Sequence, residues 1–211
     1  MATIELTITL KGPLHVGGNL AAARDIVPFA RDARGRPCIP TTTLKGLHRA
    51  ATEQVAIALG LKVCHSPVLS QMCHPINSET GCVVCRIFGS AWLPGQVFYH
   101  DLVLTAAVLT ETRVAAPQSR RRQVRIERHA TRREIVPGPL TLTGRIDHLI
   151  HDPALLGLAL AGLRAITAIG GHSATGYGLC TIEARAIDSL KRPVDEASLA
   201  AALRQLLRET P

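Results

Sequence analysis

Alternating apolar and polar residues open the chain and predict its first strand. In TIELTITL, residues 3–10, the apolar side chains fall on one face and threonine or glutamate on the other, which is typical of a half-buried strand. The alternation returns at 140–146, and further strands are predicted at 97–110 and at LCTIEA, residues 179–184. Between the last two of these in the chain stands a glycine-rich loop, GGHSATGYG, at 170–178.

Apolar residues at helical spacing predict helices at about 42–58, at 153–168 and from 195 onward. Strands and helices then follow in the order strand, helix, strand, twice over. This order predicts an α+β fold with a ferredoxin-like or RRM-like palm. We expect a single domain over residues 1–211, with insertions at about 62–91 and 111–136.

The charge of the chain and its distribution indicate what kind of partner the protein binds. The net charge is +8, and the 24 basic residues comprise 20 arginines and 4 lysines. Eight of the arginines lie within 113–133, and so local an excess predicts a polyanionic partner. A genomic preference for arginine explains the choice of residue but not this clustering. The chain has only 6 aromatic residues, so any nucleic acid is expected to be held by its backbone and not by stacked bases.

No segment predicts a membrane or secretory role. The longest apolar runs, such as ALLGLALAGL at 154–163, are too short to span a bilayer, and the N-terminus lacks the basic-then-apolar order of a signal peptide. We therefore expect a cytoplasmic protein without a membrane partner.

The start of the first predicted helix offers groups that bind phosphate. Pro40 favours extended backbone at the residue before it. The hydroxyls of Thr41 to Thr43 are placed to cap the helix that follows. Lys45 and Arg49 follow one turn apart, so free N–H groups and two cations point to a phosphodiester backbone. The alternative is an ordinary amphipathic helix with a solvated basic face.

The cysteines between residues 64 and 85 predict a structural zinc site. Cys82 and Cys85 form a CxxC pair, Cys73 is the third expected ligand, and the fourth is Cys64, His65 or His74. A redox CxxC is the competing interpretation. The remaining cysteines, Cys38 and Cys180, lie in apolar surroundings and are predicted to be buried thiols.

Five stretches together resemble the RAMP superfamily, and within it the backbone subunits of type III CRISPR effector complexes. They are GPLHVGG after the first strand, IPTTTLKGLHRAATE, CVVCRIFGS, IERHATRREIVPG and the GGHSATGYG loop. Two departures stand out. Thr41 to Thr43 replace the family's Gly-Ser-Ser, and the 111–136 excursion is shorter and richer in arginine than in the family.

The resemblance implies an RRM-like palm, copies of which stack along a guide RNA, and a thumb hairpin that wedges into the guide–target duplex. Its partners would be CRISPR guide RNA, single-stranded target RNA, other effector subunits and copies of itself. His15 is expected either to bind the backbone or to pack. The resemblance assigns RNA binding to His15, Gly17, Gly18, Thr43, Lys45, Arg49, Gly170, Gly171, His172 and Gly176, and to Arg125, Arg128 and His129 in the thumb.

The resemblance also implies an endonuclease. Asp25 matches the aspartate that the family's RNA-cleaving members require, with Mg²⁺ or Mn²⁺ as cofactor, whereas Asp32 matches a structural position. Without the resemblance, a loop aspartate such as Asp25 is expected to cap a turn. Three other functions remain open: a filament subunit without catalysis, a stand-alone guide-processing endoribonuclease, and a zinc-stabilised nucleic-acid-binding protein of unrelated fold.

Overall fold

The fold is known from a computed structural model, which describes residues 2–17, 26–64, 66, 68, 70–74, 81–104, 109–115 and 130–209. In chain order the elements are β1 (Ala2–Leu10), β2 (Ile26–Val27), β3 (Cys38–Ile39), α1 (Thr41–Ala58), α2 (Val83–Phe88), β4 (Val97–Tyr99), β5 (Leu102–Val103), β6 (Glu111–Ala115), β7 (Thr131–Ile135), β8 (Leu140–His148), α3 (Pro153–Arg164), the 3₁₀ turn η2 (Ser173–Thr175), β9 (Cys180–Ile187) and α4 (Glu196–Glu209).

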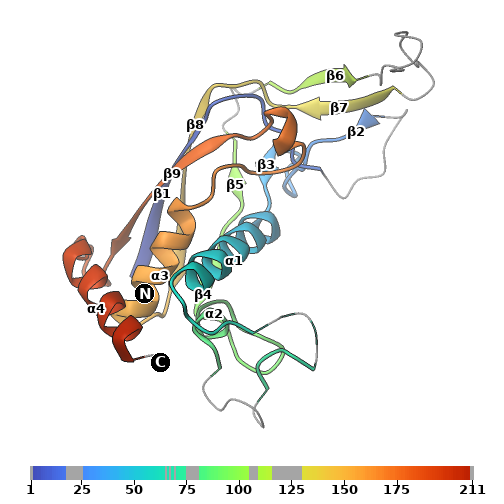
Figure 1. Cartoon of the computed structure of the whole chain (residues 1–211). Helices are drawn as coiled ribbons and strands as arrows, with labels where there is room; N and C mark the ends of the chain where they lie inside the picture. The colour runs from blue at the N-terminus through green and yellow to red at the C-terminus, as the bar shows by residue number, and fades with distance from the viewer. Residues whose placement is uncertain are drawn as a thin grey trace.

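The centre of the molecule is a four-stranded antiparallel sheet in the order β4-β8-β1-β9. The first and third strands of the βαββαβ series therefore lie in the middle and the second and fourth at the edges, as in ferredoxin-like folds. Helices α1 and α3 cover one face of this sheet, and α4 packs against α3 (Figure 1). The predicted α+β fold with a ferredoxin-like palm is confirmed.

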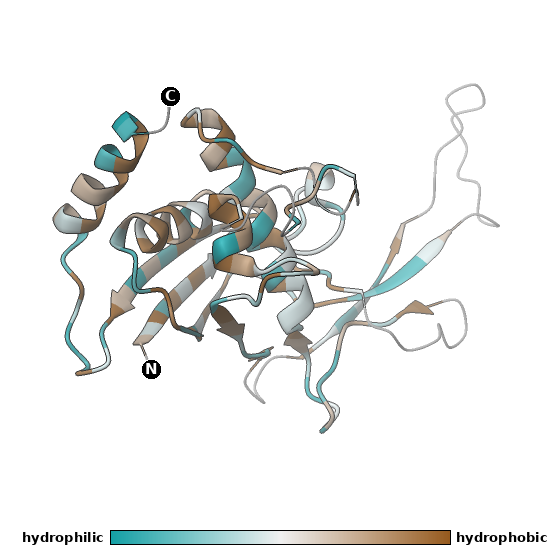
Figure 2. Cartoon of the chain, turned by 90° about the horizontal axis from the view of Figure 1, so that it is seen from below, coloured by the Kyte–Doolittle hydropathy of each residue, from teal (hydrophilic) through white to brown (hydrophobic). Residues whose placement is uncertain are grey.

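The two faces of the sheet differ in chemistry. Ile4, Leu6, Ile8 and Leu10 of β1 point toward the helices and are buried, and the strands change from hydrophobic to hydrophilic at each step (Figure 2). Among the described residues, Phe98 on the edge strand is the one aromatic side chain of the open face. Apart from Ile187 at one end, the rest of that face consists of threonines and charged residues, namely Thr3, Glu5, Thr7, Thr9, Thr141, Thr143, Arg145, Asp147, Thr181, Glu183 and Arg185. Such a face has no platform for stacking successive bases.

A buried histidine joins the two palm helices to the sheet. His48 of α1 is fully buried, its Nε2–H donates to the carbonyl of Ala159 in α3 at 2.8 Å, and its Nδ1 accepts from the Tyr99 hydroxyl at 2.7 Å. Because a carbonyl only accepts, the proton lies on Nε2 and both ring nitrogens of the neutral imidazole are satisfied. Burial lowers the pKa of His48 from 6.5 to about 4, so His48 is neutral in the folded protein at neutral pH.

Acid is expected to destabilise the palm through His48. The unfolded chain binds this proton near pH 6.5 and the folded chain only near pH 4, so the free energy of unfolding falls as the pH drops through that window. The slope for one proton is about 1.4 kcal/mol per pH unit, and the total is about 3 kcal/mol. The variant His48→Gln keeps a donor and an acceptor but has no proton to bind. Its free energy of unfolding, measured with denaturant, should fall less steeply between pH 6.5 and pH 4, by about 1.4 kcal/mol per pH unit. An identical pH profile in both proteins would contradict the assignment.

A hairpin extends from the body beside the sheet. β6 and β7 pair antiparallel, with Arg113 opposite Arg133, and β2 adds to β7 in parallel (Figure 1). Every residue of β6 is exposed, so the hairpin has little core of its own. These strands are the stem of the excursion predicted at 111–136, and residues 116–129 lie outside the described part.

Other details of the sequence prediction need correction. The strand expected at 97–110 is divided into β4 and β5, and the helix expected at 153–168 ends at Arg164. Helix α1 has Pro40 at its N-cap and no side-chain cap from the threonines; instead the carboxylate of Asp101 accepts from the backbone N–H of Thr41 at 2.7 Å. None of the helices described is long and apolar enough to cross a membrane.

Candidate nucleic-acid interface and metal centre

Four cysteines from the segment between α1 and β4 come together. The Sγ atoms of Cys64, Cys73, Cys82 and Cys85 all lie within 4.8 Å of one another. Cys82 and Cys85 sit at the start of α2, while the backbone N–H of Cys82 donates to the Cys73 sulfur at 3.1 Å and the Cys64 and Cys85 sulfurs are 3.4 Å apart. The predicted CxxC pair and its two upstream partners therefore form one cluster.

The cluster fits a tetrahedral zinc ion. With Zn–S bonds of about 2.3 Å, tetrahedral geometry places sulfurs about 3.8 Å apart, which is close to the spacing found here. Burial and the neighbouring thiols raise the pKa of Cys85, so a cation binding there displaces its proton. Bound zinc would be held by these thiolates and would supply cross-links to a segment with little core. Cys64 supplies the fourth sulfur; His74 packs its ring edge-on to Trp92 at 4.6 Å, and His65 lies outside the described residues.

The buried thiols outside the cluster are as predicted. Cys38 and Cys180 are both buried, and burial raises the pKa of Cys180 to about 11. Neither belongs to the four-sulfur group.

The two cations of α1 have different surroundings. Lys45 is exposed and, with Arg49, lines a cavity of about 440 Å³ whose other wall is the loop from Gly89 to Gly95. Arg49 is turned inward: its nitrogens bond Glu53, the Gly89 carbonyl and the Cys85 sulfur. The donors of Arg49 are therefore directed into the protein, whereas the ammonium group of Lys45 is exposed. Both residues remain predicted RNA contacts, and Lys45 is the more accessible of the two.

The tip of α1 borders a second cavity, of about 480 Å³. Gly17 and Thr43, both expected to contact RNA, line this cavity together with Thr42 and Asp101. Because Asp101 already accepts from the first N–H of the helix, its carboxylate opposes a phosphate at that position. The tip is therefore less open to anions than the sequence suggested.

The glycine-rich loop is docked on the turn that follows β1. The N–H of Gly171 donates to the carbonyl of His15 at 2.9 Å, and the N–H of Gly178 donates to the carbonyl of Pro13 at 2.7 Å. His15 itself is buried, so of its two expected roles the structure favours packing. Two stretches more than 150 residues apart in sequence thus share one edge of the molecule.

Two glycines of this loop are expected to respond differently to alanine. Gly170 and Gly176 both have left-handed backbone, with φ of +83° and +88°. A Cβ on Gly170 would lie 2.2 Å from the His15 carbonyl oxygen, whereas a Cβ on Gly176 meets nothing within 4 Å. Gly176→Ala should therefore cost only about 1 to 2 kcal/mol for left-handed alanine, and Gly170→Ala clearly more. Equal unfolding free energies for the two variants would contradict this docking.

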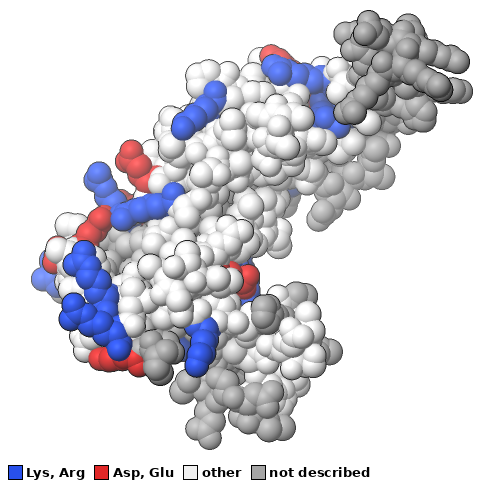
Figure 3. All heavy atoms as spheres, viewed as in Figure 1, with Lys and Arg blue, Asp and Glu red and all other residues white. Residues whose placement is uncertain are grey.

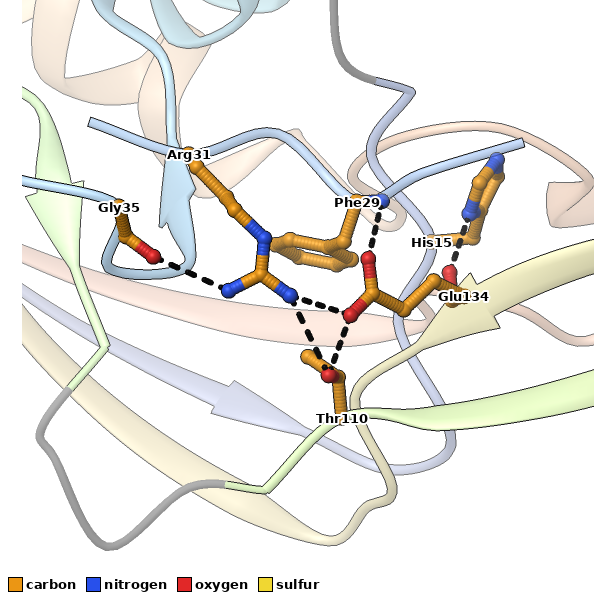
Figure 4. Close-up of polar contacts among 6 residues, drawn as sticks. All are labelled: His15, Phe29, Arg31, Gly35, Thr110 and Glu134. Carbon is orange, nitrogen blue, oxygen red and sulfur yellow. Dashed lines mark hydrogen bonds and ion pairs between the residues drawn. The ribbon is translucent and has the colours of Figure 1, made fainter. Parts of the chain in front are cut away.

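Glu134 ties the base of the hairpin to the body (Figure 4). Its carboxylate accepts the backbone N–H of Phe29 at 2.8 Å and also contacts Arg31 and the Thr110 hydroxyl. Its carbonyl accepts from Nδ1 of His15 at 2.7 Å. Burial raises the pKa of Glu134, but the bonds from Thr110 and Phe29 and the charge of Arg31 outweigh it, and the net pKa is lowered. The hairpin base is thus fixed to both neighbouring loops.

A histidine and an arginine meet where the loop faces the hairpin. His172 is exposed with φ 65° and ψ 28°, and its ring lies 5.9 Å from His15 and 6.2 Å from Tyr177. The positive charge of Arg133 lowers the pKa of His172, because it disfavours a second positive charge on the imidazole. A non-glycine residue in left-handed backbone is uncommon and often marks a functional position. Basic side chains lie exposed at the stem of β6 and β7 with acidic atoms beside them, and basic and acidic side chains also lie next to each other over α4 (Figure 3).

Sequence reasoning missed Arg133 and Tyr177. Both stand within stretches that carry the family resemblance, TRREIVPG and GGHSATGYG, so their motifs were the available signal. Of the predicted residues, the structure gathers His15, Gly17, Thr43, Gly170, Gly171, His172 and Gly176 along the turn, loop and helix tip. Other predictions lie outside the described residues, namely Gly18, Asp25, Arg125, Arg128 and His129. Asp32 has the structural role expected of it, since it accepts from the N–H groups of Arg34 and Arg36.

Comparison with known families decides what kind of protein this is. A family model described as the RAMP superfamily matches residues 7–181, from within β1 to the start of β9. The chain belongs to the RAMP superfamily. Membership supports a CRISPR-associated, RNA-binding role. A comparison with curated proteins gave no significant match. In this RAMP protein, α4 lies beyond the matched region.

Proposed function

We propose that this RAMP protein is a guide-RNA-binding backbone subunit of a cytoplasmic type III CRISPR effector complex, which cleaves bound target RNA through Asp25. Its partners are guide RNA, single-stranded target RNA, the other effector subunits and further copies of the chain. Family membership supports the CRISPR-associated and RNA-binding parts of this proposal. The type III assignment and catalysis rest on the motifs around Asp25 and in the glycine-rich loop.

One observation carries the RNA-binding part. The turn at 11–17, the glycine-rich loop and strand β7 meet at His15, whose carbonyl and imidazole bond the loop and Glu134. Gly17, at the end of the same turn, lines the cavity at the tip of α1. The exposed surface of the glycine-rich loop at Gly171 and His172, with the cations Lys45 and Arg133 on other elements, suits a ribose-phosphate chain better than the threonine-rich open face of the sheet.

This function can be tested by asking whether RNA co-purifies with the protein. We expect the protein, purified with its neighbours, to bring down short RNAs of uniform length. With the purified chain, Lys45→Ala should weaken RNA binding alike for all sequences and reduce the slope of log K against log salt by about 0.7 for one lost phosphate contact. Arg145→Ala, on the open face of the sheet, is the matched control and should leave the slope unchanged. Equal effects of the two substitutions would contradict the proposed interface.

A further inference from the structure

Arg49 reaches the cysteine cluster from the third turn of α1. Its Nε donates to Glu53 Oε1 at 2.9 Å, its Nη1 to the carbonyl of Gly89 at 2.8 Å, and its Nη2 to the sulfur of Cys85 at 3.6 Å. The side chain is 22% exposed, so these contacts are partly shielded from water. Within the described part of the chain, no other lysine or arginine bonds one of the four sulfurs.

Both ends of α2 are held by this one guanidinium. Cys85 lies in the first turn of α2, and Gly89 is its C-cap, whose N–H donates to the Cys85 carbonyl at 2.9 Å. Gly89 has φ +86°, and a Cβ on it would lie 2.7 Å from the backbone nitrogen of Gly95. The loop that follows is therefore closely packed on the end of α2, and Arg49 fixes α1 against this unit.

The charge of a zinc–thiolate centre explains why a cation is placed there. Four thiolates around a divalent ion leave a net charge of two minus. An N–H donated from a cation to one sulfur offsets part of this charge and orients the ligand, and outer partners of this kind typically change metal affinity 10- to 100-fold. Glu53 in turn holds the guanidinium in place through its Nε.

We infer that Arg49 is a positioning residue of the metal centre, and that bound zinc, acting through Arg49, fixes α1 against the loop from Gly89 to Gly95. This loop and Lys45 line the same cavity, so the metal also sets the surroundings of Lys45. The assignment of Arg49 to the zinc centre stands on its contacts alone. Only the consequence for Lys45 and RNA rests on the proposed function.

Zinc affinity of the full-length chain tests the assignment. In competition with a chromogenic chelator, Arg49→Ala should bind zinc 10- to 100-fold more weakly than the unchanged protein. Arg49→Lys should lose less, because it keeps the charge but not the fork of donors. Arg145→Ala, whose arginine lies on the open face of the sheet, is the control and should bind zinc normally. Zinc affinity of Arg49→Ala within twofold of the unchanged protein would overturn the inference.

Two further measurements separate positioning from general stability. In the cobalt-substituted protein, loss of the N–H donor raises the energy of the sulfur lone pair, so Arg49→Ala should shift the sulfur-to-cobalt charge-transfer band to longer wavelength; an unshifted band would overturn the inference. Should Arg49→Ala fail to fold, Glu53→Gln leaves the arginine in place and is expected to weaken zinc binding at least threefold, with unchanged affinity as the contrary result.

RNA binding measured on the same variants keeps the two proposals apart. If Arg49→Ala binds RNA weakly but zinc normally, Arg49 contacts RNA and does not position the metal centre, and the inference is overturned. If the unchanged protein ignores RNA while Arg49→Ala still loses zinc, the proposed function fails and the inference stands.

Discussion

Replacing Asp25 by alanine is expected to slow cleavage of a bound complementary RNA by about a hundredfold to ten-thousandfold, the range over which a positioned acid or base accelerates a reaction. A carboxylate near the scissile phosphate can position a divalent ion or accept the proton of the attacking 2′-hydroxyl. Asp25 lies outside the described residues, but the described residues that precede and follow residues 18–25 are paired: Gly17 bridges Phe29, and Ile26 of β2 pairs with Arg132 of β7.

The test uses the assembled complex with guide, complementary RNA and Mg²⁺. Asp25→Asn keeps the size of the side chain and removes the charge, so it should be nearly as slow as Asp25→Ala. Asp195→Asn is a matched control: Asp195 caps α4, far from the interface, and asparagine caps equally well. If the complex with Asp25→Ala cleaves the RNA at the same rate as the unchanged complex, the catalytic role of Asp25 is contradicted. The protein is then a filament subunit without catalysis, and only the guide-binding part of the proposal survives.

Replacing Cys85 by serine is expected to abolish stoichiometric zinc and to unfold the segment between α1 and β4. Cys85 is fully buried, its sulfur contacts that of Cys64, and Arg49 bonds it from α1. Loss of a direct ligand should weaken zinc binding by more than the roughly 100-fold that outer partners reach. If zinc is present at a hundred times its dissociation constant, the variant loses about 3 kcal/mol of unfolding free energy.

Metal analysis and thermal unfolding of the purified variant check this result. Cys180→Ser is the control, since it also alters a buried thiol but lies outside the cluster. It should lose some stability and retain its zinc. A Cys85→Ser protein that still binds one zinc ion per chain with high affinity would contradict the four-cysteine centre.

Local pattern was enough to predict the palm. The alternation of Ile4, Leu6 and Ile8 specifies which face of β1 is buried, and the apolar spacing in α1 and α3 specifies the side that packs on the sheet. These periodicities act over neighbouring residues, so a sequence displays them without knowledge of the fold. The CxxC spacing is local in the same sense, which is why the sequence predicts Cys82 and Cys85 as a pair of ligands.

Contacts between distant residues were beyond such reasoning. Asp101 caps α1 from 60 residues away, and so the threonines at its start lose the capping role that their chemistry suggests. Arg49 looks like an exposed cation one turn from Lys45, but the cysteine cluster and the Gly89 carbonyl draw it inward. The choice of Cys64 as fourth sulfur and the junction at Glu134 also depend on tertiary packing.

Photo-crosslinking of bound guide RNA followed by peptide mass spectrometry gives the decisive result for the interface. The RNA is expected to crosslink to peptides containing Lys45 of α1 and His172 and Tyr177 of the glycine-rich loop. Crosslinks confined to the open face of the sheet, at Thr7, Thr143 or Arg185, would show that the guide follows another path.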